Sequence, residues 1–574
     1  MAAGFLAGAR ALLFKQAPPD NTSLKQQGNA LLAEGRLAEA MACYEQAASL
    51  GPQDAAAHVN WGYTLVESAS WSEAERVLRA ALGLDASIAD AWFLLGQALA
   101  GQSQASKAEE AFRQALALQP DFPFAARALA VVLAGQGRPA DALEVLATAD
   151  LAYAGDPSFW HLRGNLQFAC RLYENAAESY GRAIELHPDF VEALSNRAVC
   201  CKRLGRREEA HELFARALAL RPMYPSAIYN LGVLLLDEAR CEEVLAISEE
   251  ALRVHPQDAD IHVNRADALL LTGRLGEGWL EYEWRWKARG LGVDLELPQL
   301  RSPRWTGQQP IEGKTLLVLH EQGLGDSIQF MRFVPLLLQR AARVLVQLPP
   351  PLVPLFAPRP GMSMVHEGQP LPPIDFHVML PSLPMAFATE VATIPASVPY
   401  VVTDPVRRGR WEKELGPRTG PRVGLVWAGN PAHANDANRS MALATLLTDA
   451  PPGVQWVSLQ KDVRPQDLVT LEANHIFHAG KRLADFADTA ALADAMDLVI
   501  SVDTSVAHLV GALGKPLWVL LPFRPDWRWM LGRSDSPWYP SARLFRQDAR
   551  RDWASVVDEV MQALREGFGL PALS

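Results

Sequence analysis

Apolar and polar positions follow one another in two different ways along this chain, and the change divides it near residue 288. From about Ser23 to Lys287, apolar positions recur at the spacing of amphipathic helices, in units of 34 residues. After residue 312, short runs rich in Leu, Ile and Val alternate with helical segments. Such alternation is typical of a parallel sheet with helices on both faces. The pattern therefore predicts a helical array followed by an α/β region.

Small and large residues keep fixed places within each 34-residue unit. The first small series is Gly28, Gly62, Gly96, Ala130, Gly164, Ala198, Gly232 and Ala266. The second is Ala40, Ala74, Ala108, Ala142, Ala176, Ala210, Val244 and Gly278, and four residues later stand Tyr44, Leu78, Phe112, Leu146, Tyr180, Phe214, Ser248 and Tyr282. Small residues let two helices approach closely and the large residue fills the remaining gap, but no unit can bury its apolar face alone. The pattern resembles the tetratricopeptide repeat and predicts eight stacked helix pairs with a concave inner face.

One amide position recurs on the first helix of four units. Its members are Asn60, Asn196, Asn230 and Asn264. We expect these side chains to hold the backbone of an extended acceptor peptide, each through a hydrogen bond with a net contribution of ~0.5–1.5 kcal/mol. The repeats of O-GlcNAc transferases carry a similar row of asparagines. In the alternative interpretation, the amides satisfy backbone groups within the array.

The array ends in a tryptophan-rich segment, Glu277–Lys287. Trp279, Trp284 and Trp286 at one helix end predict a packing interface with the following region rather than a ligand cage. Asp258-Ala259-Asp260 has the spacing of a metal-binding motif of other sugar transferases. Because it falls in the turn of a repeat, we interpret it as structural.

The α/β region has strand-like runs in two groups. They are expected at Thr315–Leu319, Arg343–Leu348, Ser363–Val365 and Asp375–Met379, and then at Arg422–Trp427, Gln455–Gln460, Leu498–Ser501 and Leu517–Leu521. Helices are expected at Ser327–Arg340, Met441–Thr448, Ala484–Ala495, Ser505–Leu513 and Trp553–Glu566. The predicted organisation is an N-terminal arm (1–22), the repeat superhelix (23–288), a linker (289–311) and two doubly wound lobes (312–403 and 404–574). Two such lobes facing one another across a cleft form the GT-B arrangement.

Glycines mark the turn after the first predicted strand. Thr315–Leu319 leads through the turn Gln322–Asp326 into a helix, and Gly323 and Gly325 allow a ligand close to the backbone. The glycine spacing lacks the third glycine of a dinucleotide fingerprint, so a purely structural turn is the alternative.

Three later segments carry further candidate chemistry. Trp427–Met441 follows a strand and contains Arg439, whose planar guanidinium suits a phosphate, although a surface salt bridge is the alternative. Ser501–Lys515 opens a helix with hydroxyl groups and backbone N–H groups, an arrangement that favours an anion, although a simple helix cap is the alternative. Asp526–Trp529 closes either the donor pocket or the interface between the lobes.

The composition of the chain argues against several classes of function. The formal net charge of −11 argues against non-specific binding to nucleic acid and to anionic membranes. The five cysteines (Cys43, Cys170, Cys200, Cys201, Cys241) have no disulfide or zinc spacing, which is typical of reduced thiols. No apolar run reaches the ~18–20 residues of a membrane span, and Phe5–Phe14 has no context of a signal peptide. A cytoplasmic location is expected.

Four stretches together support a named resemblance: EQGLGD, GNPAHANDANRS, DFADTAALADAMDLVISVDTSVAHL and PDWRW. They look like those of bacterial tetratricopeptide-repeat glycosyltransferases, which are related to the O-GlcNAc transferase and heptosyltransferase families. The resemblance implies a metal-independent, inverting transferase with a GT-B fold, a nucleotide-sugar as co-substrate and no other cofactor. Some relatives with this layout act on flagellin.

The same resemblance assigns roles to residues. Asp326 takes the place of the proposed heptosyltransferase base, and His320 at the strand end is the alternative, because this chain lacks the histidine of the O-GlcNAc transferase turn. The donor-binding set is Gly323, Gly325, Asn430, Arg439, Gln460, Asp503, Thr504, Ser505 and His508. The expected acceptor is a Ser or Thr hydroxyl of a protein held by the repeats. Two other functions stay open: a transferase to a glycan or lipid-linked acceptor, and a non-catalytic scaffold with a nucleotide-binding lobe.

Overall fold

A computed structural model describes residues 22–149, 152–289, 300–433 and 435–570. The predicted N-terminal arm, except Thr22, and residues 290–299 of the predicted linker lie outside the described residues. Contacts between Cα atoms divide the chain into two compact units, Met1–Ala227 and Ile228–Ser574. The described residues of the first unit form six helix pairs. The second begins within the seventh pair, so the last repeats pack with the α/β region, although the sequence periodicity continues to about residue 288.

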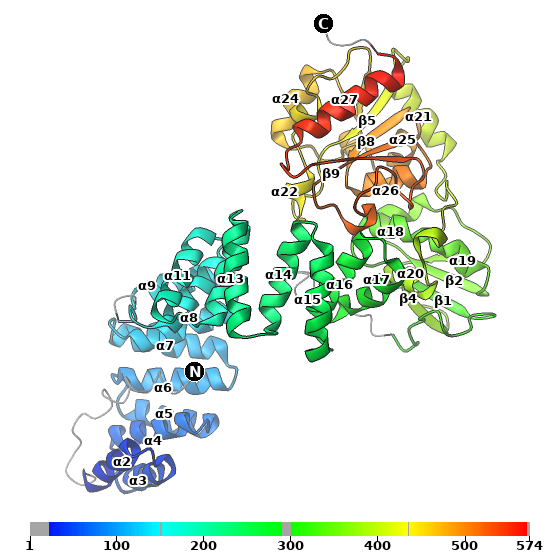
Figure 1. Cartoon of the computed structure of the whole chain (residues 1–574). Helices are drawn as coiled ribbons and strands as arrows, with labels where there is room; N and C mark the ends of the chain where they lie inside the picture. Colours follow the sequence, from blue (N-terminus) through cyan, green and yellow to red (C-terminus); the bar gives the residue numbers. More distant parts are fainter. Residues whose placement is uncertain (1–21, 150–151, 290–299, 434, 571–574) are drawn as a thin grey trace. The chain divides into compact units, whose positions relative to one another are not determined.

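The repeat array consists of antiparallel helix pairs, as Figure 1 shows for the first unit. Its helices are α2 (Thr22–Ala33), α3 (Leu37–Leu50), α4 (Ala55–Glu67), α5 (Trp71–Leu84), α6 (Ala89–Gly101), α7 (Ala105–Leu118), α8 (Pro123–Gly135), α9 (Pro139–Ala147), α10 (Pro157–Ala169), α11 (Tyr173–Leu186), α12 (Val191–Arg203), α13 (Arg207–Leu220), α14 (Pro225–Asp237), α15 (Cys241–Val254), α16 (Ala259–Leu271) and α17 (Leu275–Tyr282). The expected tetratricopeptide architecture is therefore present.

The first small series allows each helix pair to close. A Cβ atom added at Gly28 would lie 2.7 Å from the ring of Tyr44, and one at Gly164 would lie 2.6 Å from the ring of Tyr180. These distances are shorter than van der Waals contact, so the large residue of the unit occupies the space that a side chain would need. The sequence interpretation of the small and large series is confirmed at these positions.

This packing predicts opposite effects of two Gly→Ala changes in one repeat. Gly164→Ala should lower the free energy of unfolding by about 1–3 kcal/mol, because the Tyr180 ring is buried and its hydroxyl donates to Asn165 at 2.7 Å. Gly181→Ala, in α11, meets no atom closer than 3.5 Å and should raise it by ~0.5–1 kcal/mol. Urea denaturation followed by circular dichroism measures both, and equal effects would contradict the packing argument.

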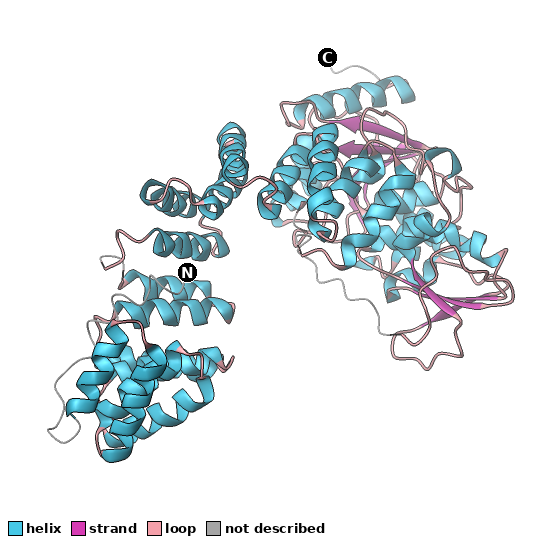
Figure 2. Ribbon diagram, turned by 60° about the horizontal axis from the view of Figure 1, so that its bottom comes forward, coloured by secondary structure: helices cyan, strands magenta, loops and turns pink. Residues whose placement is uncertain are grey.

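All strands of the described residues belong to two parallel sheets, drawn in magenta in Figure 2. The first has the order β3-β2-β1-β4 and the second β10-β9-β8-β5-β6-β7. The strands are β1 (Thr315–Leu319), β2 (Arg343–Gln347), β3 (Met362–Val365), β4 (Phe376–Met379), β5 (Arg422–Val426), β6 (Gln455–Ser458), β7 (Phe477–His478), β8 (Leu498–Val502), β9 (Leu517–Leu521) and β10 (Ala542–Arg546). The parallel α/β architecture is thus as expected. We call the parts with the first and second sheets the first and second lobes.

Short helices follow the strands. They are α18 (Leu324–Phe330), α19 (Val334–Leu338), α20 (Leu383–Ala386), α21 (Pro405–Leu415), α22 (Asp436–Arg439), α23 (Leu443–Leu446), α24 (Pro465–Ala473), α25 (Phe486–Asp494), α26 (Ser505–Ala512) and α27 (Ala554–Phe568), with 3₁₀ turns at Glu283–Trp286, Met331–Phe333, Pro350–Leu355, Leu380–Ser382, Val391–Thr393, Gly480–Arg482 and Trp527–Trp529. No helix of the described residues is long and apolar enough to cross a membrane.

The continuous helix predicted over Ser327–Arg340 is wrong at both its start and its middle. It begins at Leu324, so Gly325 and Asp326 lie in its first turn and not in a preceding loop. It is interrupted at Met331–Phe333, where Pro335 cannot donate the backbone hydrogen bond of a continuous helix. The expected strands and helices also omitted β7, β10, α20, α21, α22 and α24.

The end of the repeat array packs into the first and second lobes. Trp279 of α17 is buried, lies edge-on to Trp527 with ring centroids 5.2 Å apart, and donates its indole N–H to the Thr389 carbonyl at 3.1 Å. Trp284 instead stacks on His262 of α16, with centroids 4.0 Å apart. The eighth repeat therefore belongs structurally to the α/β part.

Candidate functional site

The candidate residues follow the carboxyl ends of parallel strands. β1 leads into Gly323–Asp326, β5 into the loop with Asn430 and Arg439, β8 into Asp503–Ser505, and β9 into Asp526–Arg528. Ligands of open parallel sheets gather at this edge. The candidate residues predicted from the sequence therefore lie at the carboxyl edge of each sheet.

The two edges meet at a glycine. A Cβ atom added at Gly325 would lie 2.8 Å from Cδ2 of His508 and 3.4 Å from Cα of Ser505. Gly325 is in the first turn of α18, and Ser505 and His508 are in the first turn of α26, which Figure 1 shows beside α18. The structure thus brings the GLGD turn and the D-T-S-x-x-H segment into contact, and a side chain at position 325 would push them apart.

Arg439 joins the same cluster from the β5 loop. Its guanidinium donates to the Asp503 carbonyl oxygen at 3.0 Å, and its Nε lies 3.8 Å from Asp436. That Nε is buried and makes no hydrogen bond within the part of the chain that the structure describes. Gly429 leaves room for this position, because a Cβ there would lie 2.7 Å from the guanidinium. Arg439 is therefore held in place with donor capacity left over.

The start of α26 follows Asp503, to which Arg439 binds. Thr504 precedes the helix, and its side chain caps no N–H of the first turn; its hydroxyl instead lies 3.2 Å from that of Ser501. Unpaired N–H groups at a helix N-terminus carry a partial positive charge. Thr504 and Ser505 thus stand at the start of α26, and Arg439 binds the residue that precedes them.

Asp326 is engaged by an arginine from the other lobe. One carboxylate oxygen pairs with Arg528, and the other accepts the Gly323 N–H at 2.8 Å. Burial raises the pKa of Asp326, while the Arg528 charge opposes that rise. Arg528 also donates to Gln329 of α18 at 2.7 Å. The predicted base is therefore one partner of a buried connection between the lobes.

Asp526 supports Arg528 from its own loop. It accepts from the guanidinium at 2.8 Å and from the Arg528 backbone N–H at 3.0 Å. Burial alone would raise the pKa of Asp526, but the charge and hydrogen bonds of Arg528 lower it below the usual range. Arg528 thus holds two carboxylates, one in each lobe.

His508 is buried as a neutral ring. Its Nδ1 lies 2.9 Å from the Tyr539 hydroxyl, and its ring stacks on Trp529 with centroids 5.4 Å apart. Its Nε2 lies 4.0 Å from a carboxylate oxygen of Asp503. Burial lowers the pKa of His508 to about 3 and raises the pKa of Asp503 to about 6.

These two shifts oppose each other in their effect on stability. The Asp503 pKa rises from 3.8 to about 6 on folding, so its contribution to stability is lost as pH increases through that interval. The His508 pKa falls from 6.5 to about 3, so its contribution grows with pH over much the same interval. Asp503→Asn should therefore make the free energy of unfolding rise more steeply between about pH 4 and about pH 6 than in the unmodified protein. Urea midpoints at several pH values test this, and an unchanged slope would contradict it.

The positions and hydrogen-bond partners of four further predicted residues are as follows. The Asn430 side chain accepts the Ala432 N–H at 3.0 Å within its own loop, and the Gln460 amide pairs with both backbone groups of Ala428, donating at 2.9 Å. Gly323 precedes α18 as its N-cap. His320 follows β1, its Nδ1 is buried without a hydrogen-bond partner among the described residues, and burial lowers its pKa. His320 is thus the second candidate base, with an unpaired ring nitrogen.

The asparagine row forms hydrogen bonds between neighbouring repeats. Asn196 of α12 donates to Asn165 of α10 at 3.1 Å, and Asn264 of α16 donates to the Tyr229 carbonyl of α14 at 2.8 Å. Asn60 of α4 is buried, and Asn230 lies on α14. Asn196 and Asn264 therefore form hydrogen bonds within the array, as the alternative interpretation expects. Peptide binding by this row stays a prediction.

Several residues of the site were not selected from the sequence. Arg528 contacts Asp326 and Tyr539 contacts His508, whereas Gln329 contacts Arg528. Arg332 of the first lobe is buried and donates to the Trp538 carbonyl at 2.7 Å. An arginine within the tryptophan-rich segment Asp526–Trp529 was the one available signal, whereas nothing local distinguishes Gln329 or Arg332.

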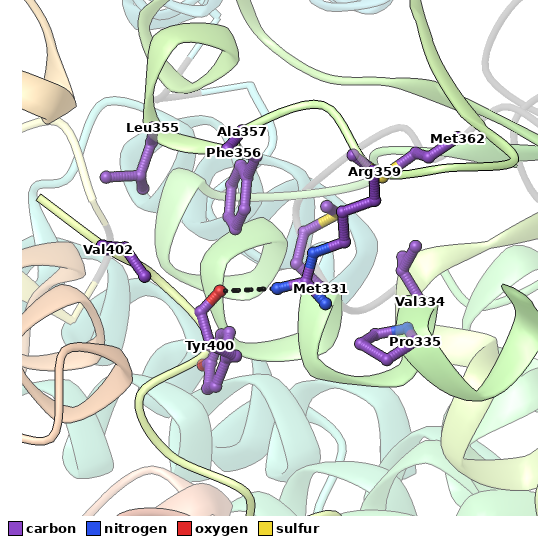
Figure 3. Close-up of a pocket in the computed structure, with 10 residues that line it drawn as sticks. All are labelled: Met331, Val334, Pro335, Leu355, Phe356, Ala357, Arg359, Met362, Tyr400 and Val402. Carbon is purple, nitrogen blue, oxygen red and sulfur yellow. Dashed lines mark hydrogen bonds between the residues drawn. The ribbon is translucent and has the colours of Figure 1, made fainter. Parts of the chain in front are cut away.

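A pocket of the first lobe is lined by a different set of residues. Figure 3 shows it between the start of α19, the 3₁₀ turn before Ala357, and the segment with Tyr400 and Val402. Its lining is mostly apolar, with Arg359 donating to the Tyr400 carbonyl at 3.3 Å. None of the predicted site residues lines it.

Comparison with protein families identifies the repeats. Models described as tetratricopeptide repeats match residues 28–68, 59–121, 99–166 and 160–223. The chain therefore contains tetratricopeptide repeats, as the periodicity predicts.

Among curated proteins, this chain is similar to Protein FlbA of Caulobacter vibrioides, with 27% identity over 466 residues, covering 74% of this chain and 70% of FlbA. Because the repeat array is less than half of the chain, this similarity extends into the α/β region.

Among solved structures, the chain is similar to YrrB, a tetratricopeptide-repeat protein with an unusual peptide-binding site. The identity is 22%, the match covers 32% of this chain and 95% of YrrB, and the TM-score is 0.31. The chain is also similar to PilF of Pseudomonas aeruginosa, with 19% sequence identity. This match covers 38% of this chain and 96% of the PilF chain, and the TM-score is 0.33.

Proposed function

We propose that this chain is a glycosyltransferase of GT-B type that moves a sugar from a nucleotide-sugar to a Ser or Thr hydroxyl of a protein acceptor. The observation that carries the proposal is the meeting of the two carboxyl edges at Gly325, with Arg439 bound to Asp503 beside them. A substrate bound at this place would touch residues from both lobes. A transferase needs this property, because one side must hold the donor and the other must prepare the acceptor.

The donor diphosphate is assigned to the second lobe. Among the described residues the Arg439 Nε makes no hydrogen bond, and the side chain of Thr504 caps no N–H at the start of α26. Fixed donors of this kind stabilise the negative charge that develops on a leaving phosphate. In this scheme the guanidinium and the helix N-terminus take the part that a metal ion plays in other transferases.

The acceptor hydroxyl needs a base in the first lobe. Asp326 and His320 are the two candidates, and burial raises the pKa of Asp326, which is the direction that strengthens a carboxylate as a general base. Its pairing with Arg528 orients one oxygen, and the Gly323 N–H orients the other. Burial lowers the pKa of His320, and its Nδ1 has no hydrogen-bond partner among the described residues.

The repeats supply the acceptor site in this proposal. Tetratricopeptide repeats commonly bind peptides, and YrrB is a repeat protein of this kind that has a peptide-binding site. A peptide held by the repeats would deliver its hydroxyl to the reacting sugar, which lowers the entropic cost of the reaction. Flagellin is the acceptor suggested by the resemblance of the sequence motifs.

A ligand screen tests the donor assignment. UDP-, CMP-, GDP- and ADP-linked sugars are added to the full chain, and a donor at 100 times its Kd should stabilise it by ~2.7 kcal/mol. Arg439→Ala should remove most of this stabilisation, whereas Arg464→Ala is a nearby control, since Arg464 pairs with Asp436 and not with Asp503. A screen in which no nucleotide-sugar stabilises the protein, or in which Arg439→Ala binds unchanged, would refute the assignment.

A further inference from the structure

The loop that carries the predicted base is held by the end of the repeat array. We infer that Arg285, in the 3₁₀ turn after the eighth repeat, is a positioning residue that sets the conformation of Glu321–Asp326 for the reaction. This inference rests on the proposed function. According to this inference, the end of the eighth repeat positions the loop of the predicted base, in addition to the role of the repeats in binding the acceptor.

Arg285 is an arginine with no exposed side-chain surface. It forms two parallel hydrogen bonds to the carboxylate of Glu321, at 2.8 and 2.9 Å, and Glu321 is the second residue after β1. Such a two-point pairing fixes the carboxylate in orientation as well as distance. The first residue pair of the EQGLGD stretch therefore takes its position from the repeat end.

Further bonds of Arg285 join a second strand end to the same point. The guanidinium donates to the Ser382 hydroxyl at 2.8 Å and to Glu283 at 2.7 Å. Ser382 follows the carboxyl end of β4, the neighbour of β1 in the first sheet. Arg285 thus ties two adjacent strand ends of the first lobe to the repeat array, and the rings of Tyr282 and Trp286 lie 4.6 Å from its guanidinium carbon.

The next residue of the loop has an unusual backbone. Gln322 has a φ of 62°, a conformation that costs free energy for any residue other than glycine. Its side-chain amide donates to the Tyr282 hydroxyl at 3.0 Å and to Glu321 at 2.9 Å. The strained conformation is therefore held by a tyrosine of the repeat and by the carboxylate that Arg285 fixes.

One residue, Gly323, connects Gln322 to the predicted base Asp326 through a hydrogen bond. Gly323 follows, and its N–H binds the Asp326 carboxylate at 2.8 Å. A change in the peptide between Gln322 and Gly323 moves this N–H and with it the oxygen of Asp326. Arg285 does not contact Asp326, so its effect on the reaction passes through Glu321 and Gln322.

Two conservative variants of the full chain test the inference. Arg285→Lys keeps the charge but loses the two-point pairing, and Tyr282→Phe removes only the hydroxyl that holds Gln322. Arg274→Lys is the control, because Arg274 of the same repeat pairs with Glu277 at the exposed surface. We expect amide hydrogen exchange of peptides covering residues 320–327 to become faster by on the order of tenfold in both variants and to stay unchanged in the control.

Turnover of the best nucleotide-sugar from the screen is measured in the same samples. We expect kcat to fall in both variants with little change in KM, because the donor contacts assigned to Arg439 and α26 are untouched. Unchanged exchange of residues 320–327 in both variants would overturn the inference whatever the activity. An unmodified protein that neither binds nor turns over any nucleotide-sugar would refute the proposed function, and the exchange data would then still show whether the repeat end fixes the loop.

Discussion

Replacing Arg528 with leucine is expected to lower the free energy of unfolding by about 3–5 kcal/mol. The guanidinium bridges the lobes by binding Asp326 and Gln329 of the first lobe and Asp526 of the second. Its side chain is 8% exposed, so its loss leaves buried carboxylates without their counter-charge. Urea denaturation followed by tryptophan fluorescence measures the effect, because Trp527 and Trp529 flank the site.

Arg550→Leu is the matched control for this change. Arg550 pairs with Asp548 at the surface with a side chain that is 70% exposed, so its replacement should change stability by less than about 1 kcal/mol. Equal losses in the two variants would show that the bridge between Arg528 and Asp326 contributes no more than a surface ion pair. That result would remove the reason to regard the two lobes as fixed against each other here.

Replacing Asp326 with asparagine is expected to lower turnover of the donor and acceptor pair by about 10²–10⁴-fold, the usual contribution of a general base. Asparagine keeps the shape and an oxygen for the Gly323 N–H, so the turn should persist. The change also breaks the pairing with Arg528, so activity is measured well below the unfolding midpoint of the variant. Steady-state kinetics of the two proteins give the ratio directly.

His320→Gln completes this experiment, because His320 is the other candidate base. If Asp326 is the base, His320→Gln should retain activity within about tenfold of the unmodified protein. A full loss in His320→Gln with an active Asp326→Asn would transfer the role to His320. Full activity in both variants would contradict a base at this strand end.

The repeat array and the sheet strands could be predicted because their signals are local. Gly164 and Tyr180 stand 16 residues apart in a pattern that repeats every 34, and the structure packs one against the other. β1 and β9 have the bounds expected from their short apolar runs. The short edge strand β7 has only two residues, too few for an apolar run to mark it.

Helix boundaries depend on single residues more than on the apolar pattern. Pro335 lies inside the apolar run that predicted one helix over Ser327–Arg340, and its missing N–H divides that run. Conversely, Asp404 and Pro405 mark the start of α21, where the Asp404 carboxylate accepts the Val406 N–H at 2.8 Å. An Asp-Pro pair of this kind is a start signal that the sequence carries even where the apolar periodicity is weak.

The ion pairs between distant residues of the site could not be predicted from local sequence patterns. Arg528 is 202 residues from Asp326 in the chain, and Arg285 is 36 residues from Glu321. A sequence marks such residues only as charges near a motif, and whether they pair depends on how two separately formed sheets meet. The candidate residues of the second lobe could be proposed because polar and hydroxyl side chains follow its strand ends, which is a local feature.

The most direct test of the account is a structure of the full chain with the nucleoside diphosphate of its best donor. The account predicts that the diphosphate lies within hydrogen-bond distance of the Arg439 guanidinium and of the backbone N–H groups at the start of α26, on the side facing Gly325. A diphosphate bound elsewhere, such as at Arg359 in the pocket of Figure 3, would contradict it.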